Sequence, residues 1–349
     1  MKKFLIFLLV LIVSAAVAAT LVYRHLTQLL TLPISHQPEQ LFTIEKGTSS
    51  KQFSELLLQQ GLIDKKIWGL PYLFKLHPEY TLKAGTFSLK NINNLEQLLL
   101  LIHSGKEAQF SLTLPEGTTF QQWKATLAEA PHLQHSLKDK SEAEIYQLLD
   151  LPKEAVKVGK LEGWLYPDTY YYTANSSDLT LLKRAADKMQ KTLQQAWAQR
   201  DKSLPLKSEY ELLILASIIE KESAVAAERP QIASVFVNRL KRGIKLQTDP
   251  TVIYGMGEHY QGNIRKQDLN EATPYNTYII EGLPPTPIAM PDKSSLEAAA
   301  NPADTDYLYF VADGSGGHKF SRSLNEHNRA VQQYLRWYRN WKAQQGNKE

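Results

Sequence analysis

The chain contains no cysteine among its 349 residues. This absence excludes disulfide bonds, thiolate metal sites and cysteine nucleophiles, and it leaves an oxidising compartment open without favouring one. The length predicts about two domains beyond any targeting segment, at roughly 150 residues each.

Clusters of basic residues are also lacking. The formal net charge is only +4, and no run of Lys and Arg with interleaved aromatic residues occurs, so nucleic acid is not an expected partner. Two of the nine histidines, His132 and His135, are about one helical turn apart. Their stretch is polar and holds no nearby carboxylate pair, which favours surface residues over a metal site. We therefore expect neither a metal ion nor another cofactor.

Charge is absent from residues 4–23, a run of twenty residues that follows Lys2 and Lys3. That length spans a bilayer as a helix, and lysines ahead of a first span favour a cytoplasmic N-terminus. We expect residues 1–25 to form a single-pass anchor in the cytoplasmic (inner) membrane, with the rest of the chain on the outer, periplasmic side. The alternative is a cleaved signal peptide, because residues 16–18 (AVA) resemble a cleavage site. We favour the anchor because the apolar run continues beyond that site.

The pattern after the anchor predicts a linker and then a small α/β module. Residues 26–41 contain two prolines and show little periodicity, which is typical of a linker. Residues 42–110 alternate between strand and helix signals, with glycines where elements end. The expected elements are strands at 42–48 and 85–89 and helices at 51–60 and 95–102.

The first strand, turn and helix pattern recurs about seventy residues later. Residues 112–118 (LTLPEGT), followed by an amphipathic stretch through Trp123, match it and indicate a second, related unit. We assign residues 111–200 to an intermediate α+β region. An aromatic cluster at 164–172 (WLYPDTYYY) suits either core packing or sugar stacking, and core packing is favoured because tyrosine is common in strands.

Residues 201–345 are expected to form a further domain. It combines predicted helices with a β-hairpin around the glycine-rich stretch 313–317 (DGSGG). The expected fold class is thus α+β, with an N-terminal transmembrane helix, a small α/β module, and a mixed helix and β-hairpin domain. The helices are predicted at 179–200, 209–223, 229–242 and 324–343.

A carboxylate interrupts the apolar stripe of the helix predicted at 209–223 (EYELLILASIIEKES). At about 100° per residue, Glu222 falls beside Ile218 and Ile219, whereas Glu220 falls near the polar side. Burial without a cationic partner raises a carboxyl pKa by up to ~3–5 units, and a general acid must still hold its proton near neutral pH. Glu222 is therefore the candidate acid. The alternative is a residue at the solvent-exposed rim of an ordinary amphipathic helix.

Polar, turn-rich loops follow this helix. Loops of this type usually carry function or are disordered, and their amides, hydroxyls and aromatic rings suit a glycan. Structural turns are the alternative for each residue. The candidate substrate-binding residues are Gln247, Thr248, Asp249, Tyr254, Tyr275, Asn276, Thr277 and Tyr278.

Several motifs together resemble the YceG-like endolytic murein transglycosylase (MltG) family. They occur in order and, with the apolar N-terminus, cover nearly the whole chain. The motifs are 216–223 (ASIIEKES), 234–240 (SVFVNRL), 246–255 (LQTDPTVIYG), 275–278 (YNTY) with 282–285 (GLPP), and 307–311 (YLYFV).

The resemblance implies a membrane-anchored enzyme with a LysM-like module at 42–110 and a catalytic transglycosylase domain at 201–345. It implies cleavage of the β-1,4 bond between N-acetylmuramic acid (MurNAc) and N-acetylglucosamine (GlcNAc) inside nascent peptidoglycan strands, with 1,6-anhydro-MurNAc ends. It further implies termination of strand growth in the company of peptidoglycan synthases. The family's catalytic glutamate precedes Ser or Thr, which maps to Glu222.

A lytic reaction needs only one catalytic carboxylate. Ordinary glycosidases use two, whereas here the N-acetyl group or the 6-hydroxyl of the substrate can attack the anomeric carbon. Glu220, a candidate auxiliary residue, and Asp249 are the nearest candidates for a second carboxylate. The alternative enzyme is therefore a hydrolytic muramidase, and the alternative of another class is a non-catalytic peptidoglycan-binding scaffold tethered to the membrane.

Overall fold

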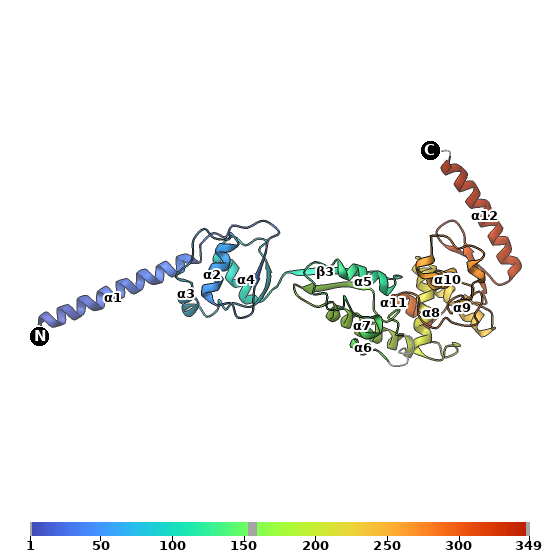
Figure 1. The fold of residues 1–349 in the computed structure, drawn as a ribbon, viewed down its shortest axis with the longest axis horizontal. Helices are drawn as coiled ribbons and strands as arrows, with labels where there is room; N and C mark the ends of the chain where they lie inside the picture. Colours follow the sequence, from blue (N-terminus) through green and yellow to red (C-terminus); the bar gives the residue numbers. More distant parts are fainter. Residues whose placement is uncertain (1, 153–158, 347–349) are drawn as a thin grey trace. The chain divides into compact units, whose positions relative to one another are not determined.

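A computed structural model describes residues 2–152 and 159–346 of the chain. These residues form helices and three two-stranded sheets (Figure 1). The expected α+β class is therefore confirmed. The chain divides into two compact units: the first is Met1–Phe110 with Tyr171–Asn175, and the second is Ser111–Tyr170 with Ser176–Glu349. The intermediate region and the further domain expected from the sequence thus fall largely within the second unit.

The apolar N-terminus forms a single long helix, α1 (Lys2–Leu29). Among the described residues it is the one helix that is long and apolar enough to cross a membrane. Only its last turns contact the rest of the first unit, where Leu26 is buried against α3.

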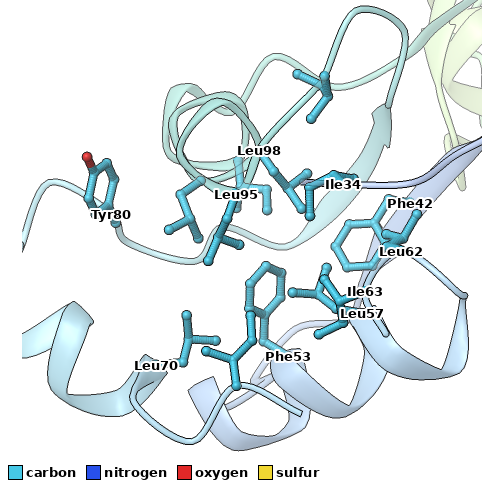
Figure 2. Packing of buried hydrophobic residues seen from close by; sticks show 14 of the residues in the cluster. Ile34, Phe42, Phe53, Leu57, Leu62, Ile63, Leu70, Tyr80, Leu95 and Leu98 are labelled. Atoms are coloured by element: carbon cyan, nitrogen blue, oxygen red, sulfur yellow. The ribbon is translucent and has the colours of Figure 1, made fainter. Parts of the chain in front are cut away.

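The first unit folds in the order β1 (Leu41–Ile44), α2 (Ser50–Gln59), α3 (Leu70–Leu76), β2 (Gly85–Ser88) and α4 (Leu95–Ser104). The two strands are antiparallel, with Phe42 opposite Phe87. Helices α2, α3 and α4 contribute leucines and Phe53 to the core that these strands cover (Figure 2). The expected strands and helices are confirmed, and α3 is an additional helix.

The same order of elements recurs in β3 (Gln109–Leu114), α5 (Phe120–Ala128), α6 (Glu142–Leu148), β4 (Asp168–Thr173) and α7 (Asp178–Ala198). The turns after β1 and β3 both place a glycine in the left-handed region, Gly47 at φ 90° and Gly117 at φ 67°. Both following helices begin with a capping box, which satisfies backbone N–H groups at the helix start. The structure therefore confirms the internal repeat.

The aromatic cluster of this second copy is mostly core. Trp164, Tyr170 and Tyr172 are buried, and Trp164 stacks on Tyr210. Core packing, the favoured interpretation, is confirmed for these three rings.

Helix α8 (Glu209–Glu222) lies at the centre of the second unit. It packs against α7, α9 (Arg229–Lys241), α10 (Asp249–Met256) and α11 (Lys293–Ala300) (Figure 1). Because helices surround it, every residue from 212 to 220 is buried. Short 3₁₀ helices lie between the longer elements, at Ala226–Glu228, Gly257–His259 and Asp268–Asn270.

The predicted hairpin and terminal helix complete the unit. Strands β5 (Tyr309–Ala312) and β6 (His318–Ser321) are antiparallel, with Phe310 opposite Phe320. Helix α12 (Leu324–Gly346) contacts both strands. The hairpin thereby forms a platform beside α9, which it also contacts.

Candidate active site

Glu222 is the last residue of α8, and Ser223 leaves the helix in an extended conformation. The half-buried Glu222 side chain lines a pocket of about 420 Å³ together with residues of the 246–249 loop, α9, β5 and α12. Glu222 therefore borders this pocket. The pocket is lined by Glu222, Phe236, Arg239, Leu246, Gln247, Thr248, Asp249, Tyr278, Tyr309, Phe310, Val311, Leu324, His327 and Val331.

Burial is the main cause that raises the pKa of the Glu222 carboxyl to about 7, and the nearby charge of Asp249 acts in the same direction, whereas the hydrogen bond from Thr248 and the charge of Arg239 act in the opposite direction. The Thr248 hydroxyl donates a hydrogen bond to Glu222 Oε1. This bond leaves Oε2 available to carry the proton. A carboxyl with a pKa near 7 holds and releases a proton at physiological pH, as an acid–base catalyst must.

Thr248 is itself held by a network of buried hydroxyls. Its backbone N–H donates to Thr277 Oγ1 at 3.1 Å, its carbonyl accepts from Thr251 Oγ1 at 2.7 Å, and the two other threonine hydroxyls lie 2.8 Å apart. All three threonines are buried. The loop that touches the acid is therefore fixed before any substrate arrives.

Gln247 has a strained backbone at φ 49°, in a region that non-glycine residues rarely adopt. Its side-chain Oε1 accepts a hydrogen bond from Arg239 Nη1 at 3.3 Å. Since a guanidinium group only donates, the amide oxygen must face Arg239 and the NH₂ group must point elsewhere. Because Gln247 lines the pocket, its NH₂ group is available as a hydrogen-bond donor there.

Arg239 is buried and rigidly held in the same wall. Its Nε donates to the Leu308 carbonyl at 2.7 Å, Nη1 donates to the carbonyls of Lys245 and Leu246 at 3.1 and 3.0 Å, and the guanidinium lies 5.0 Å from the ring centroid of Tyr309. A fixed cation in a partly desolvated pocket acts more strongly than one in water.

A second carboxylate, Asp249, also lines the pocket. The Tyr278 hydroxyl donates to Asp249 Oδ1 at 2.7 Å. Burial and this hydrogen bond raise the pKa of Tyr278, so the hydroxyl keeps its proton and remains a donor. Asp249 is thus oriented by a neutral partner and retains its second oxygen for other contacts.

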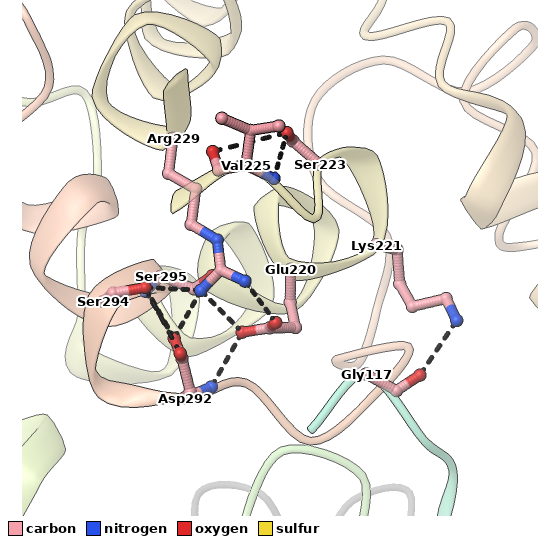
Figure 3. Close-up of polar contacts among 9 residues, drawn as sticks. All are labelled: Gly117, Glu220, Lys221, Ser223, Val225, Arg229, Asp292, Ser294 and Ser295. Carbon is pink, nitrogen blue, oxygen red and sulfur yellow. Dashed lines mark hydrogen bonds and ion pairs between the residues drawn. The ribbon is translucent and has the colours of Figure 1, made fainter. Parts of the chain in front are cut away.

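Glu220 occupies a different environment from the one expected. The prediction that it lies near the polar side of α8 is wrong, because α11 and α9 cover that side and leave Glu220 8% exposed. Arg229 donates to both of its oxygens at 2.8 and 3.3 Å, and the Asp292 backbone N–H donates to Oε2 at 2.8 Å (Figure 3). Glu220 does not line the pocket, so the structure does not bring this candidate auxiliary residue together with Glu222.

The remaining candidates lie outside the pocket. Asn276 is 1% exposed, and its NH₂ group donates to three backbone carbonyls at 2.8–3.2 Å. Thr277 is fully buried. Tyr275 packs edge-on against Tyr254 and bonds the Thr286 hydroxyl. The structure therefore gathers Gln247, Thr248, Asp249 and Tyr278 around Glu222. The other four candidates do not line the pocket and instead pack within or against the loops; they are Tyr254, Tyr275, Asn276 and Thr277.

Comparison with known proteins decides the family. The model of the YceG-like family matches residues 42–333. The chain belongs to the YceG-like family. A curated relative from Bacillus subtilis, named endolytic murein transglycosylase, is 34% identical over 305 residues, which cover 84% of each chain. A relative of the same name from Streptococcus pneumoniae is 29% identical over 370 residues, which cover 96% of this chain and 65% of that one. The crystal structure of a YceG-like protein from Listeria monocytogenes superposes with a TM-score of 0.52 at 31% identity, covering 84% of this chain and 99% of that one.

Several pocket residues of this YceG-like chain were not singled out from the sequence. Arg239 lies three residues after the buried Phe236 on α9, so it is a charged residue on an apolar helix face, the same signal that marked Glu222. Tyr309 and Phe310 belong to the predicted hairpin and to the motif 307–311, but periodicity offers no sign that a strand borders a pocket. Among the described residues, no three His, Asp or Glu side chains are grouped so that they could hold a metal ion.

Proposed function

We propose that the chain is a membrane-anchored endolytic murein transglycosylase. In this proposal it cleaves the MurNAc–GlcNAc β-1,4 bond inside nascent peptidoglycan strands, leaves 1,6-anhydro-MurNAc ends and so terminates strand elongation. The names of the relatives support the substrate and the reaction class. The observation that carries the proposal is a carboxyl with a pKa near 7 in an open pocket beside fixed hydrogen-bonding groups.

Glu222 acts first as an acid and then as a base. Protonated Oε2 donates its proton to the glycosidic oxygen, and the bond from that oxygen to C1 of MurNAc breaks. The MurNAc 6-hydroxyl attacks C1 and gives its proton to the Glu222 carboxylate, which restores the acid. No water is consumed and one proton is returned, so a single carboxyl suffices.

The pocket walls supply the groups that a sugar chain needs. Gln247 offers a donor for a carbonyl oxygen such as that of an acetamido group, Asp249 offers an acceptor, and Tyr309 and Phe310 offer apolar surface on one side. Hydrogen bonds of this kind contribute about 0.5–1.5 kcal/mol each, and more where the partner is charged in the transition state.

The N-terminal helix supports anchoring in the membrane. Helix α1 is exposed along its apolar run and meets the rest of the first unit only at its end. In the proposal α1 is retained and places the remaining chain on the periplasmic side, and the first unit acts as a LysM-like module.

A hydrolytic muramidase is the second candidate, because Asp249 shares the pocket and could serve as the second carboxylate. Mass spectrometry of fragments released from peptidoglycan by the full-length protein in detergent separates the possibilities. We expect anhydro ends; reducing ends would indicate a hydrolase, and no release would indicate a scaffold.

The decisive variant in this assay is Glu222→Gln, which should lower turnover by at least ~10²–10⁴. Glu209→Gln is the matched control, since Glu209 begins the same helix and does not line the pocket. Equal activity of both variants would refute the assignment of Glu222.

A further inference from the structure

Helix α3 of the first unit and the turn before it expose a row of large hydrophobic side chains. Trp68 is 79% exposed, Tyr72 62% and Leu76 51%, and outside α1 the first two are the most exposed large hydrophobic side chains of the described residues. Their spacing of four residues places Tyr72 and Leu76 on one helix face. Leu70 and Leu73 on the opposite face are fully buried. Single exposed hydrophobic residues need no explanation, but a row on one face indicates an interaction surface.

This surface lies beside the end of the apolar helix. The backbone at Gly69 approaches α1 so closely that an added Cβ would lie 2.7 Å from Leu26 and 2.9 Å from Leu29. Trp68 and Lys65 also share a pocket with His25. Figure 1 shows α3 on the side of the first unit from which α1 emerges.

The depth of these residues follows from helix geometry. The uncharged run of twenty residues ends at Tyr23, which matches a hydrocarbon core of about 30 Å at 1.5 Å per residue. His25 lies only ~3 Å further along the axis. Trp68, which shares a pocket with His25, is therefore at the level of the lipid headgroups when α1 spans the bilayer.

The chemistry of the surface suits that level. Trp and Tyr concentrate at membrane interfaces, and lysines nearby attract anionic headgroups. The ammonium groups of Lys66 and Lys75 lie 5.3 and 5.9 Å from the ring centroids of Trp68 and Tyr72. Lys66 also pairs with Glu55 at 2.7 Å. Lys65 and Lys75 are exposed, and the carboxylates nearest to them along the chain are Asp64 and Glu79, which are exposed as well.

We propose that Lys65, Trp68, Tyr72, Lys75 and Leu76 form a membrane-contact surface that seats the first unit on the headgroup layer of an anionic bilayer. The contact rests on the proposed anchoring by α1. The contact would hold the first unit in one orientation at the membrane. A flexible tether alone would leave that orientation free.

The absence of cysteine permits a direct test. Tyr72→Cys in the full-length chain, labelled with an environment-sensitive dye, is reconstituted at one copy per nanodisc of phosphatidylglycerol and phosphatidylethanolamine. Lys46→Cys is the matched control. Lys46 is exposed and follows the end of the β1–β2 pair at which Ile44 is opposite Gly85, and it is not part of the proposed membrane-contact surface. We expect iodide to quench the dye at position 72 at least threefold less than at position 46, and nitroxide-labelled lipid to quench only position 72.

Three other results would overturn the proposal in distinguishable ways. Equal iodide quenching at both positions in anchored protein refutes the contact and leaves the anchor intact. Protection at position 72 that persists in detergent without lipid shows that the surface is covered by protein. A mature protein that begins near Ala19 refutes the anchor and with it the contact. The reaction is tested independently, by whether this protein releases anhydro fragments. Replacing the anionic lipid by phosphatidylcholine should reduce the protection, as expected for Lys65 and Lys75.

Discussion

The acid in the pocket should make the folded chain less stable as pH rises. The pKa of the Glu222 carboxyl is raised from 4.5 to about 7. Below the unfolded pKa the group is protonated in both states. Between the two pKa values the unfolded chain releases the proton and the folded chain keeps it, so the free energy of unfolding falls as pH rises, and above about pH 7 the penalty is constant. Glu222→Gln removes this titration.

The size of the effect follows from the pKa difference. Each pKa unit corresponds to about 1.36 kcal/mol, so the full shift sets an upper limit of about 3.4 kcal/mol. Because the pocket is open to solvent, we expect about 1–3 kcal/mol. A change of 1 kcal/mol moves Tm by about 2–4 °C in a domain of this size, so Glu222→Gln should raise Tm by roughly 2–12 °C at pH 8.

The assay is thermal unfolding of the full-length protein in detergent at pH 4 and pH 8, with Glu209→Gln as the control. Glu222→Gln should gain stability relative to the native chain at pH 8 and show little difference at pH 4. A Tm difference that is the same at both pH values would refute the raised pKa, whatever the variant does to activity.

Three further predictions follow from the pocket and its supports. Gln247→Glu keeps an acceptor for Arg239 but loses the NH₂ donor. The value of kcat/KM for glycan release should therefore fall about tenfold or more, with little change in Tm. Full activity would show that Gln247 serves only to hold Arg239 in position. Asn276→Ala removes the side-chain donor to three backbone carbonyls, of which those of Asp268 and Glu271 keep a backbone donor. The change should cost about 1–3 kcal/mol of stability while activity per folded molecule is retained. The reverse result, in calorimetry and turnover, would place Asn276 in the substrate site. The rate of glycan cleavage should decline above about pH 7 as Glu222 loses its proton, and a rate that keeps rising to pH 9 would exclude Glu222 as the acid.

The repeat in the fold could be read from the sequence because its signals are local. A strand, a glycine turn and a capped helix depend on neighbouring residues, and both copies carry the same capping chemistry. Helix α3 was missed because it is short, and Tyr72 within it and Trp68 just before it are exposed, so no apolar periodicity marks it. Its position beside α1 depends on tertiary packing at Gly69, which no local pattern contains.

The two glutamates of α8 show where periodicity stops being informative. A helical wheel distinguishes two faces only when one face meets solvent, and α8 is covered all round up to Glu220. Both carboxylates therefore lie in costly positions. The ion pair with Arg229, nine residues further along the chain, offsets the cost of burying Glu220. Glu222 lies where the helix ends and the pocket begins. The tertiary partner separates the two roles, and the spacing along α8 does not.

The loop residues divide for a similar reason. An amide in a polar loop serves equally well to bind a glycan or to hold its own backbone, and the sequence is the same in both cases. Asn276 saturates its NH₂ group within its own loop. Gln247 reaches Arg239 with its oxygen alone. Only the structure shows which amide has a donor left for a ligand.

The two pocket carboxylates, Glu222 and Asp249, lie at opposite ends of their helices, and this difference favours the neutral form of one and the charged form of the other. Glu222 ends α8, where the helix dipole is negative and disfavours a further negative charge, and Asp249 begins α10, where the dipole is positive and favours one. Thr248 joins the two ends, since it is the N-cap residue of α10 and donates its hydroxyl to Glu222. The group that must deliver a proton thus lies where the neutral form is favoured. The group that can face the positive charge developing on the sugar ring lies where the charged form is favoured. Two carboxylates in one pocket therefore do not by themselves imply hydrolysis, because the pocket can use one as the acid and the other as a fixed charge.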